Sequence, residues 1–319
     1  MKVLDLEAAP DVTLSLIDLP LAMEGYHHFF GVWLVRDEGR GRNVIVDPGP
    51  ASTAPLLLET LGGLGVDRLD LVLLTHIHLD HSGGLAELLE AFPAAMVNVH
   101  PRGKPHLADP ARLWESSLRV IPEMAPAYGE PLPVDEGRFI PEGAEIPGIL
   151  AVDTPGHAPH HRSFFYETPA GPVLFAGEAA GTFTRLDTVV PGADEGKYVL
   201  RPASPPRFYI DQALQSIETL KAVNAILLCY AHFGYSKEVS RMLDEAARQI
   251  QLWRVLFAEF LEGKGRPGAD QVDMDGLLSF LLSRDPWLEA FPMLPSDVRS
   301  REMNFMLSSA SGFLETVTA

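Results

Sequence analysis

The most informative stretch of this chain reads Thr75-His76-Ile77-His78-Leu79-Asp80-His81-Ser82-Gly83-Gly84. It places three histidines and one aspartate within the six positions from His76 to His81. Imidazole and carboxylate groups are the preferred ligands of Zn²⁺, and they also suit iron and manganese. The stretch therefore predicts a metal site.

The His-rich stretch lies between a predicted strand, Leu69–Leu74, and a predicted helix, Leu85–Ala91. The loop that follows a strand is where α/β sheets place their ligands. Residues two apart in an extended chain point the same way, so His76 and His78 can bind one ion together. Asp80 and His81 follow at the helix entrance, where they can face a second ion.

Three more candidate ligands each follow a predicted strand: His157, Glu178 and His232. A single histidine is more often structural than metal-binding. Three candidates placed beyond three strand ends, however, predict that these ends converge on residues 75–84.

Between residue 10 and about residue 235, short β-rich runs alternate with helical patterns, which predicts a layered α/β fold. The predicted strands are Val12–Ile17, Phe29–Arg36, Asn43–Val46, Leu69–Leu74, Met96–Val99, Ile149–Val152, Arg162–Tyr166, Pro172–Phe175 and Ala225–Leu228. The predicted helices are Ala54–Leu61, Leu85–Ala91, Ala111–Ile121 and Asp211–Ala222. Two long connections, Pro101–Gly148 and the irregular Thr182–Pro206, are typical of lids or binding loops, or of insertions without function.

After Tyr235 the strand signals stop, and the remaining pattern is helical: Lys237–Glu262, Gly276–Leu282 and Val298–Leu314. We therefore divide the chain into a metal-binding domain over residues 1–235 and a helical C-terminal extension over residues 236–319. The apolar stripe of the first of these helices predicts packing on the main domain or on a second copy of the chain, and less often a substrate wall.

Composition limits the possible functions of this chain of 319 residues. It is 46% hydrophobic and 21% charged, which is typical of a soluble globular protein. The 43 acidic and 25 basic residues give a net charge of -18, which disfavours nucleic acid and anionic membranes as partners. No apolar run approaches the roughly 20 residues of a membrane span, and Met1–Pro10 lacks the apolar segment of a secretory signal. We expect a cytoplasmic protein with a small-molecule substrate, and homo-oligomerisation is left open.

Five motifs, taken in order, resemble those of the metallo-β-lactamase fold superfamily, and the resemblance covers about Thr13–Tyr235. They are Val46-Asp47-Pro48-Gly49, Thr75 to Gly84, Thr154-Pro155-Gly156-His157, Ala176-Gly177-Glu178 and Ala231-His232. The resemblance implies an αββα sandwich with the metal ions at one edge, without assigning a subfamily.

The resemblance also implies roles for these residues. A first metal would be bound by His76, His78 and His157, and a second by Asp80, His81 and His232. Asp47 would steady the ligand loop by hydrogen bonds, a role compatible with forming the turn of Asp-Pro-Gly. The implied cofactors are two divalent ions, zinc before iron or manganese.

Glu178 departs from the superfamily pattern, in which an aspartate usually bridges the two metals at this position. Glutamate keeps the carboxylate but extends its reach by one methylene, about 1.5 Å, where coordination distances tolerate only about 0.2 Å. Glu178 therefore bridges both ions, binds one of them, or only supports the ligands, and the number of ions stays open.

The implied chemistry is hydrolysis by a metal-activated hydroxide that Asp80 orients as a catalytic residue. An apolar-aromatic pocket that includes Tyr26, His28 and Trp114 suits a small ester, lactone or thioester better than a polyanion. The helical tail is similar to that of glyoxalase II-type thioesterases, although their basic glutathione-binding residues have no match here. The alternatives are a mononuclear-iron sulfur dioxygenase and a non-catalytic metal-binding scaffold, while the net charge disfavours a phosphodiesterase or RNA-processing nuclease.

Overall fold

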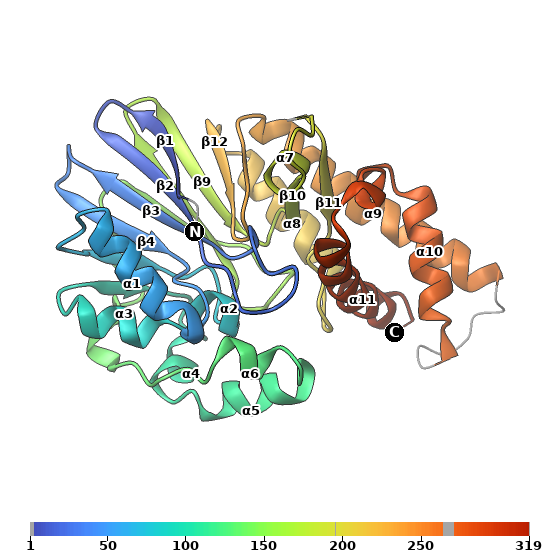
Figure 1. Cartoon of the computed structure of the whole chain (residues 1–319), viewed down its shortest axis with the longest axis horizontal. Coiled ribbons are helices and arrows are strands. Elements are labelled where there is room, and N and C mark those ends of the chain that lie inside the picture. The colour runs from blue at the N-terminus through green and yellow to red at the C-terminus, as the bar shows by residue number, and fades with distance from the viewer. Residues whose placement is uncertain (1–2, 195, 264–270, 319) are drawn as a thin grey trace.

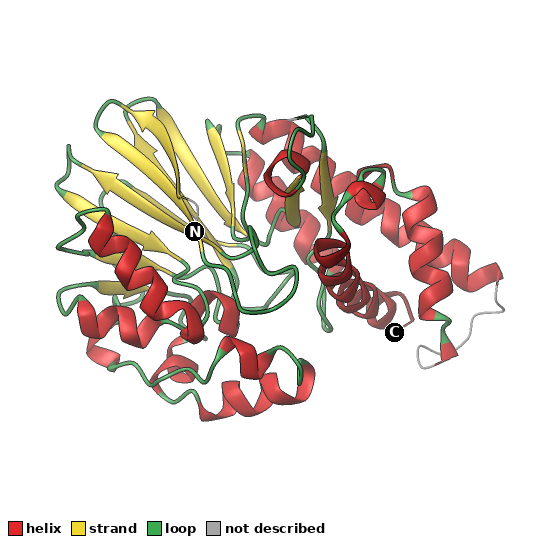
Figure 2. Cartoon of the chain, in the orientation of Figure 1, coloured by secondary structure: helices red, strands yellow, loops and turns green. Residues whose placement is uncertain are grey.

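Two β-sheets lie face to face in the fold, and helices cover their outer faces (Figure 1). The computed structural model describes residues 3–194, 196–263 and 271–318. Figure 2 shows most strands at the upper left, with helices below them and to their right. The predicted αββα sandwich with C-terminal helices is confirmed.

The first sheet has the strand order β1-β2-β3-β4-β5-β6. Its strands are β1 (Val3–Ala9), β2 (Val12–Asp18), β3 (Gly31–Asp37), β4 (Arg42–Val46), β5 (Leu71–Leu73) and β6 (Met96–Asn98). Pairing is antiparallel from β1 to β4 and parallel from β4 to β6. The end of β5 therefore delivers the chain to the edge of the sheet where residues 75–84 begin.

The second sheet has the order β13-β12-β9-β8-β7. Its strands are β7 (Ile149–Asp153), β8 (Arg162–Thr168), β9 (Gly171–Gly177), β12 (Leu227–Tyr230) and β13 (Tyr235–Ser236). Strands β9 and β12 pair in parallel. Their ends therefore lie at the same edge of the sheet, which places the residues that follow them close together.

Both faces of the central strands β2 and β3 are largely buried, which explains their apolar runs, whereas the edge strand β1 has exposed Asp5 and Glu7. In β3 the side chains of Val32 and Leu34 pack toward the helices, whereas Trp33 and Val35 pack between the two sheets. This alternation is the period of two that a strand imposes on its side chains.

Helices fill the remaining layers and connections. They are α1 (Ala54–Gly63), α2 (Leu79–Ser82), α3 (Leu85–Ala91), α4 (Lys104–Ala108), α5 (Ala111–Val120), α6 (Ala125–Tyr128), α7 (Leu186–Val189), α8 (Ile210–Lys221), α9 (Val239–Gly263), α10 (Met274–Arg284) and α11 (Ser296–Thr318). Every helix predicted from the sequence is present, and no end is shifted by more than four residues. The long connection after β6 contains α4, α5 and α6.

The connection Thr182–Pro206, predicted to be irregular, instead forms an antiparallel pair of strands. Strands β10 (Thr182–Arg185) and β11 (Tyr198–Arg201) pair over four residues, with α7 between them. These short runs show no strand pattern in the sequence, and packing stabilises them instead. Phe183 of β10 stacks on Tyr230 of β12 with ring centroids 4.9 Å apart. The prediction also missed β1, whose partner β2 fixes it at the sheet edge, and the two-residue strand β13.

The helices after Ser236 share a hydrophobic core with the second sheet. The predicted stripe on α9 is buried, and it consists of Met242, Ala246, Ile250, Trp253 and Phe257. It packs in one cluster with Phe165 and Leu174 of the sheet. Within the described ranges, no helix is long and apolar enough to cross a membrane.

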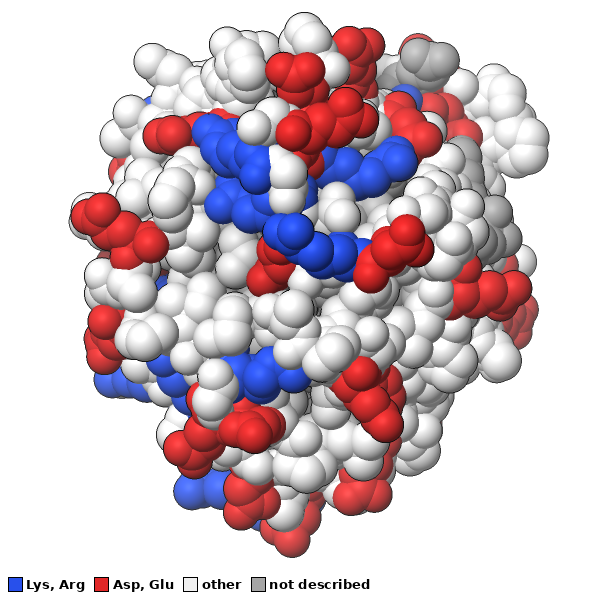
Figure 3. All heavy atoms as spheres, turned by 90° about the vertical axis from the view of Figure 1, so that its left-hand side faces the viewer, with Lys and Arg blue, Asp and Glu red and all other residues white. Residues whose placement is uncertain are grey.

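Acidic and basic side chains alternate on the surface. On the face at the left of Figure 1, Lys and Arg side chains lie against Asp and Glu side chains (Figure 3). Local ion pairs of this kind recur in the chain, as between Arg40 and Asp37 at 2.7 Å and between Arg162 and Asp153 at 2.7 Å.

A buried ion cluster ties α11 to the body of the fold. Glu302 accepts hydrogen bonds from Arg201 Nε at 2.9 Å and from Arg301 Nη2 at 2.8 Å. Arg301 also donates to the backbone carbonyls of Gly25 and His27 and lies over the Phe29 ring, 4.3 Å from its centroid. All three charged side chains are at most 3% exposed. One carboxylate thus neutralises only one of two buried guanidinium groups.

We expect Glu302→Gln to lower the free energy of unfolding by about 3–5 kcal/mol at pH 7, because it leaves two buried cations without a counter-charge. Urea unfolding followed by circular dichroism measures this. The matched control is Glu259→Gln, which removes an exposed partner of Arg284 and should cost less than about 1 kcal/mol.

The pH dependence of this effect follows from the arginines. Burial alone would raise the pKa of Glu302, but Arg201 and Arg301 lower it from 4.5 to about 2. The stabilisation is therefore complete at neutral pH and lost as the pH falls from about 4.5 toward 2. The difference between wild type and variant should shrink over that range, and a constant difference would contradict the assignment.

Candidate metal centre

Residues 75–84 form the loop that leaves β5 and enters α2. The backbone N–H of Thr75 donates to Asp47 Oδ1 at 2.8 Å, and its carbonyl accepts from the backbone N–H of Arg162 at 2.8 Å. These bonds attach the loop to both sheets. His76 therefore projects from a backbone held on two sides, and it is fully buried.

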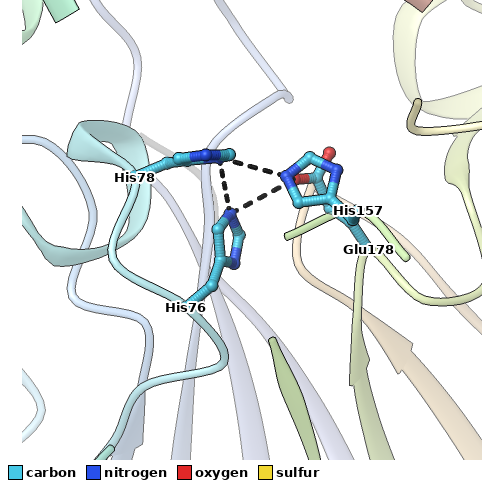
Figure 4. Close-up of side chains that lie close together, drawn as sticks. All are labelled: His76, His78, His157 and Glu178. Atoms are coloured by element: carbon cyan, nitrogen blue, oxygen red, sulfur yellow. Dashed lines mark hydrogen bonds and ion pairs between the residues drawn. The ribbon is translucent and has the colours of Figure 1, made fainter. Parts of the chain in front are cut away.

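A first group of ligand side chains consists of His76, His78, His157 and Glu178. Nδ1 of His78 lies 3.0 Å from Nε2 of His76 and 3.0 Å from Nε2 of His157. Figure 4 shows the three rings pointing toward one another, with the Glu178 carboxylate beside His157. The side chains come from the loops after β5, β7 and β9, as the positions of the strand ends predict.

A second group consists of Asp80, His81 and His232. Nε2 of His81 lies 3.4 Å from Oδ2 of Asp80. The ring of His232 stacks on Phe29 at a centroid distance of 4.2 Å, and the backbone N–H of Phe233 donates to the carbonyl of Phe29 at 2.8 Å. The loop after β12 is thereby fixed with His232 facing α2.

Glu178 lies between the two groups. Its Oε2 is 2.8 Å from Nε2 of His157 and 3.7 Å from Nε2 of His81, and its Oε1 is 3.3 Å from Nε2 of His232. Oε2 thus faces histidines of both groups, while Oε1 faces His232 of the second group. The longer side chain of glutamate places its carboxylate within contact distance of both groups.

Hydrogen bonds fix the orientation of three of these imidazoles. Nδ1–H of His157 donates to the carbonyl of Ala203 at 3.0 Å, and Nδ1–H of His81 donates to Asp47 Oδ2 at 3.2 Å. The Thr75 hydroxyl donates to Asp47 at 2.7 Å, so it accepts from Nδ1–H of His76 at 3.0 Å. Nε2 of each ring is therefore the nitrogen directed at the site, and in His76 and His157 it carries a lone pair.

This arrangement fits metal ions. The lone pairs of His76 and His157 face one nitrogen of His78, which can carry only one proton, and both also face Glu178 Oε2. Nitrogen lone pairs converging on a carboxylate require a cation between them. Burial and the neighbouring histidines lower the pKa of His76 well below its usual value, so the ring is in the neutral form that binds metals.

The electrostatics of the second group also favour a cation. Burial alone would raise the pKa of Asp80, but His81 and His232 lower it to about 2. Burial alone would likewise lower the pKa of His81, but Asp80 and Asp47 raise it well above its usual value. Asp80 is therefore ionised, and Nε2 of His81 and Nδ1 of His232 are buried without a hydrogen-bond partner among the described residues.

His161 supports Glu178, a role that no motif in the sequence indicates. The backbone N–H of Glu178 donates to Nε2 of His161 at 3.0 Å, so Nδ1 carries the proton and donates to the Thr154 hydroxyl at 2.8 Å. Gly177 has φ +60°, and a Cβ there would collide with His161 and Thr75. The sequence shows only that His161 directly precedes the run that forms β8.

The ligand groups line a cavity of about 600 Å³. Helices α5 and α6 form one wall, with Leu113, Ile121, Met124 and Tyr128, and α11 forms another, with Asn304, Phe305, Ser308 and Ser309. The walls of the cavity thus come from the long connection after β6 and from the C-terminal helix α11, two segments far apart in sequence.

Three residues expected in the pocket wall lie elsewhere. Tyr26 is buried among the aromatic side chains of the first sheet, and its hydroxyl donates to Met124 Sδ at 2.9 Å. His28 faces Asp18, 3.0 Å away, and Trp114 packs on the hydrophobic core beneath α5. The direction of a side chain in a loop follows no regular period, so the sequence could not show that Tyr26 and His28 point away from the cavity.

Comparison with known proteins agrees with the fold and the site. A family model described as the metallo-beta-lactamase superfamily matches residues 32–232. A metallo-beta-lactamase fold-containing protein of Sulfurisphaera tokodaii is 28% identical over 195 residues, which are 58% of this chain and 67% of that protein. A hydroxyacylglutathione hydrolase of Albidiferax ferrireducens is 29% identical over 224 residues, 69% of this chain and 66% of that enzyme.

Other hydroxyacylglutathione hydrolases also match, and those compared are covered over 35% to 66% of their own length. Among solved structures, a metallo-beta-lactamase family protein of Thermus thermophilus has a TM-score of 0.57 and 21% identity, covering 97% of this chain and 93% of that one. That likeness concerns the fold.

Proposed function

The chain belongs to the metallo-beta-lactamase superfamily, and we propose that this metal-dependent hydrolase is a thioesterase with a small-molecule substrate. The observation that carries the proposal is the meeting of two ligand groups at Glu178, on the wall of a cavity open to solvent. In the proposed centre His76, His78 and His157 would hold one ion, Asp80, His81 and His232 would hold a second, and Glu178, which contacts both groups, would be a ligand as well.

The named relatives favour a thioester over the ester and lactone that the sequence leaves open. Several are hydroxyacylglutathione hydrolases. Glutathione carries an acyl group on its sulfur, so the name describes cleavage of a thioester. Since these enzymes are matched over only part of their length, the likeness supports the class of bond and leaves the acyl group and the thiol open.

When bound, divalent ions lower the pKa of water toward neutrality and polarise a carbonyl oxygen. The residues of the chain supply the rest. Asp80 lines the cavity and is ionised, so its carboxylate can accept a hydrogen bond from the attacking water and orient it toward the acyl carbon. The hydrogen bonds from His81 and Thr75 to Asp47 keep the ligand loop in place while this occurs.

The bond changes suit this cavity. The water oxygen bonds to the acyl carbon, the carbon–sulfur bond breaks with its electron pair on sulfur, and the two protons of the water end on the thiol and in solvent. A thiol has a pKa of about 8.5, so its anion leaves without prior protonation. The ionisable groups that line the cavity besides the metal groups and the arginines are His106, His160 and Tyr128. A thiolate leaves without help from any of them, whereas the alkoxide of an ester leaves far less readily.

The test combines metal analysis with a substrate panel. We expect protein purified without added metal to contain two divalent ions per chain, zinc before iron or manganese, and to hydrolyse thioesters faster than matched esters and lactones. A single iron with oxygen uptake on a persulfide would establish the dioxygenase alternative instead. Hydrolysis of the lactones alone would overturn the thioesterase.

A further inference from the structure

The cavity wall is basic in an acidic protein. Apart from the two carboxylates of the metal groups, its charged side chains are four arginines: Arg102, Arg112, Arg201 and Arg207. The chain has 43 acidic and 25 basic residues, so a wall of average composition would be acidic. Basic side chains therefore outnumber acidic ones at this cavity, although the chain as a whole is acidic.

Three of these arginines have no acidic partner among the described residues, whereas several arginines elsewhere in the chain are paired. Arg40, Arg162 and Arg185 each form an ion pair of 2.7 Å or less, and mixed charge also covers the face in Figure 3. Within the described ranges, no carboxylate pairs with the guanidinium group of Arg102, Arg112 or Arg207. Glu315 accepts from the backbone N–H of Arg207, not from its side chain.

Arg201 adds a buried charge to the inner wall. It is 3% exposed and shares Glu302 with Arg301, so the three side chains carry a net positive charge. Nε donates to Glu302 and Nη1 to Ser309 at 3.4 Å, which leaves Nη2 without a protein acceptor among the described residues. A buried cation of this kind is stabilised by an anion in the adjoining space.

We propose that the substrate is an anionic thioester, whose carboxylate or phosphate groups are bound by the arginines of α4, α5 and β11–α8 that line this cavity. Arg102 precedes α4, Arg112 lies on α5, Arg201 ends β11, and Arg207 lies in the loop before α8. This inference rests on the proposed thioesterase activity and extends it to the charge of the substrate.

The chemistry of the wall matches such a molecule. A guanidinium group binds carboxylate or phosphate through two parallel hydrogen bonds. Leu113, Ile121, Met124 and Phe305 line the same cavity, and they can cover the uncharged part of a thiol or acyl chain. Positive charge at the wall also attracts an anion against the net charge of the protein.

The experiment compares three acetyl thioesters on the metal-loaded full chain: a neutral one of N-acetylcysteamine, one of glutathione with carboxylates, and one of coenzyme A with phosphates. We expect kcat/KM for at least one anionic thioester to exceed that for the neutral one, and the ratio to fall about tenfold to a hundredfold in Arg112→Ala and in Arg207→Ala. The preferred anion distinguishes carboxylate from phosphate recognition.

Arg119→Ala is the matched control, because Arg119 is an exposed arginine on the same helix α5 but does not line the cavity. Its ratio should equal that of the wild type. Binding of the uncleavable S-methyl thioether of the preferred thiol, measured by calorimetry, should weaken in the two wall variants and with rising salt.

The outcomes separate the two proposals. No cleavage of any thioester would overturn the thioesterase. Equal cleavage of neutral and anionic thioesters, with Arg112→Ala and Arg207→Ala behaving like Arg119→Ala, would leave the thioesterase standing and overturn the anionic substrate.

Discussion

Glu178→Gln is expected to remove bound metal and to lower kcat/KM at least about 100-fold. Even residues that only orient metal ligands cost 10–100-fold in affinity or activity when they are changed. Glu178 contacts histidines of both groups, His157 at 2.8 Å and His232 at 3.3 Å. Glutamine is neutral and presents an N–H₂ group where a carboxylate oxygen would bind, so both groups lose a ligand. Metal content per chain and thioester kinetics measure the effect.

Two further variants sharpen this test. Glu178→Asp keeps the charge but shortens the side chain by about 1.5 Å, beyond the tolerance of about 0.2 Å of a coordination bond. It should therefore bind less metal than the wild type, although aspartate is the usual residue of the superfamily. Glu87→Gln changes a partly buried carboxylate of α3 outside both groups and should change neither quantity. Full metal content in Glu178→Asp would refute a bridging role that depends on the reach of glutamate.

His78→Ala should abolish measurable turnover, with a loss of about 1,000-fold or more. Polarisation and water activation by a metal ion contribute several kcal/mol, and each 1.36 kcal/mol corresponds to a factor of ten in rate. Nδ1 of His78 lies 3.0 Å from the facing nitrogens of His76 and His157, so its loss opens the first group. The measurement is kcat/KM on the preferred thioester, together with the metal content of the purified variant.

His100→Ala is the control for this variant. His100 is partly exposed, lies 3.8 Å from Asp153 and belongs to neither ligand group. Its removal should leave turnover and metal content unchanged. Substantial activity retained by His78→Ala would show that the first group is not where the reaction occurs.

The sequence predicts the ligand groups well because their positions follow from regular structure. His76 and His78 share a side of an extended segment, and His157, Glu178 and His232 each follow a strand, so the sheets bring them together. The strongly apolar strands are predicted for the same reason, since burial on both faces leaves a continuous apolar run.

The walls of the cavity could not be predicted in this way. Arg112 and Arg207 lie far apart in the sequence and belong to no motif. They line one cavity only because the segment that contains α5 packs over the metal groups together with α11. The sequence suggested Tyr26 for the wall, yet its ring lies in a hydrophobic cluster that forms only in the folded chain. The strands β10 and β11 were missed because their stability comes from contacts such as Phe183 with Tyr230 rather than from pattern.

Helix α11 contributes to the wall of the cavity, whereas every ligand of both groups lies between residues 76 and 232. The metal ligands and part of the wall that selects the substrate are therefore encoded in separate segments of the gene. Recombination or drift confined to the last segment can change which molecules are accepted while the reacting centre is inherited intact. Because one fold can carry many activities, a cavity wall encoded apart from the reacting centre is a route by which one ancestor diversifies into many enzymes.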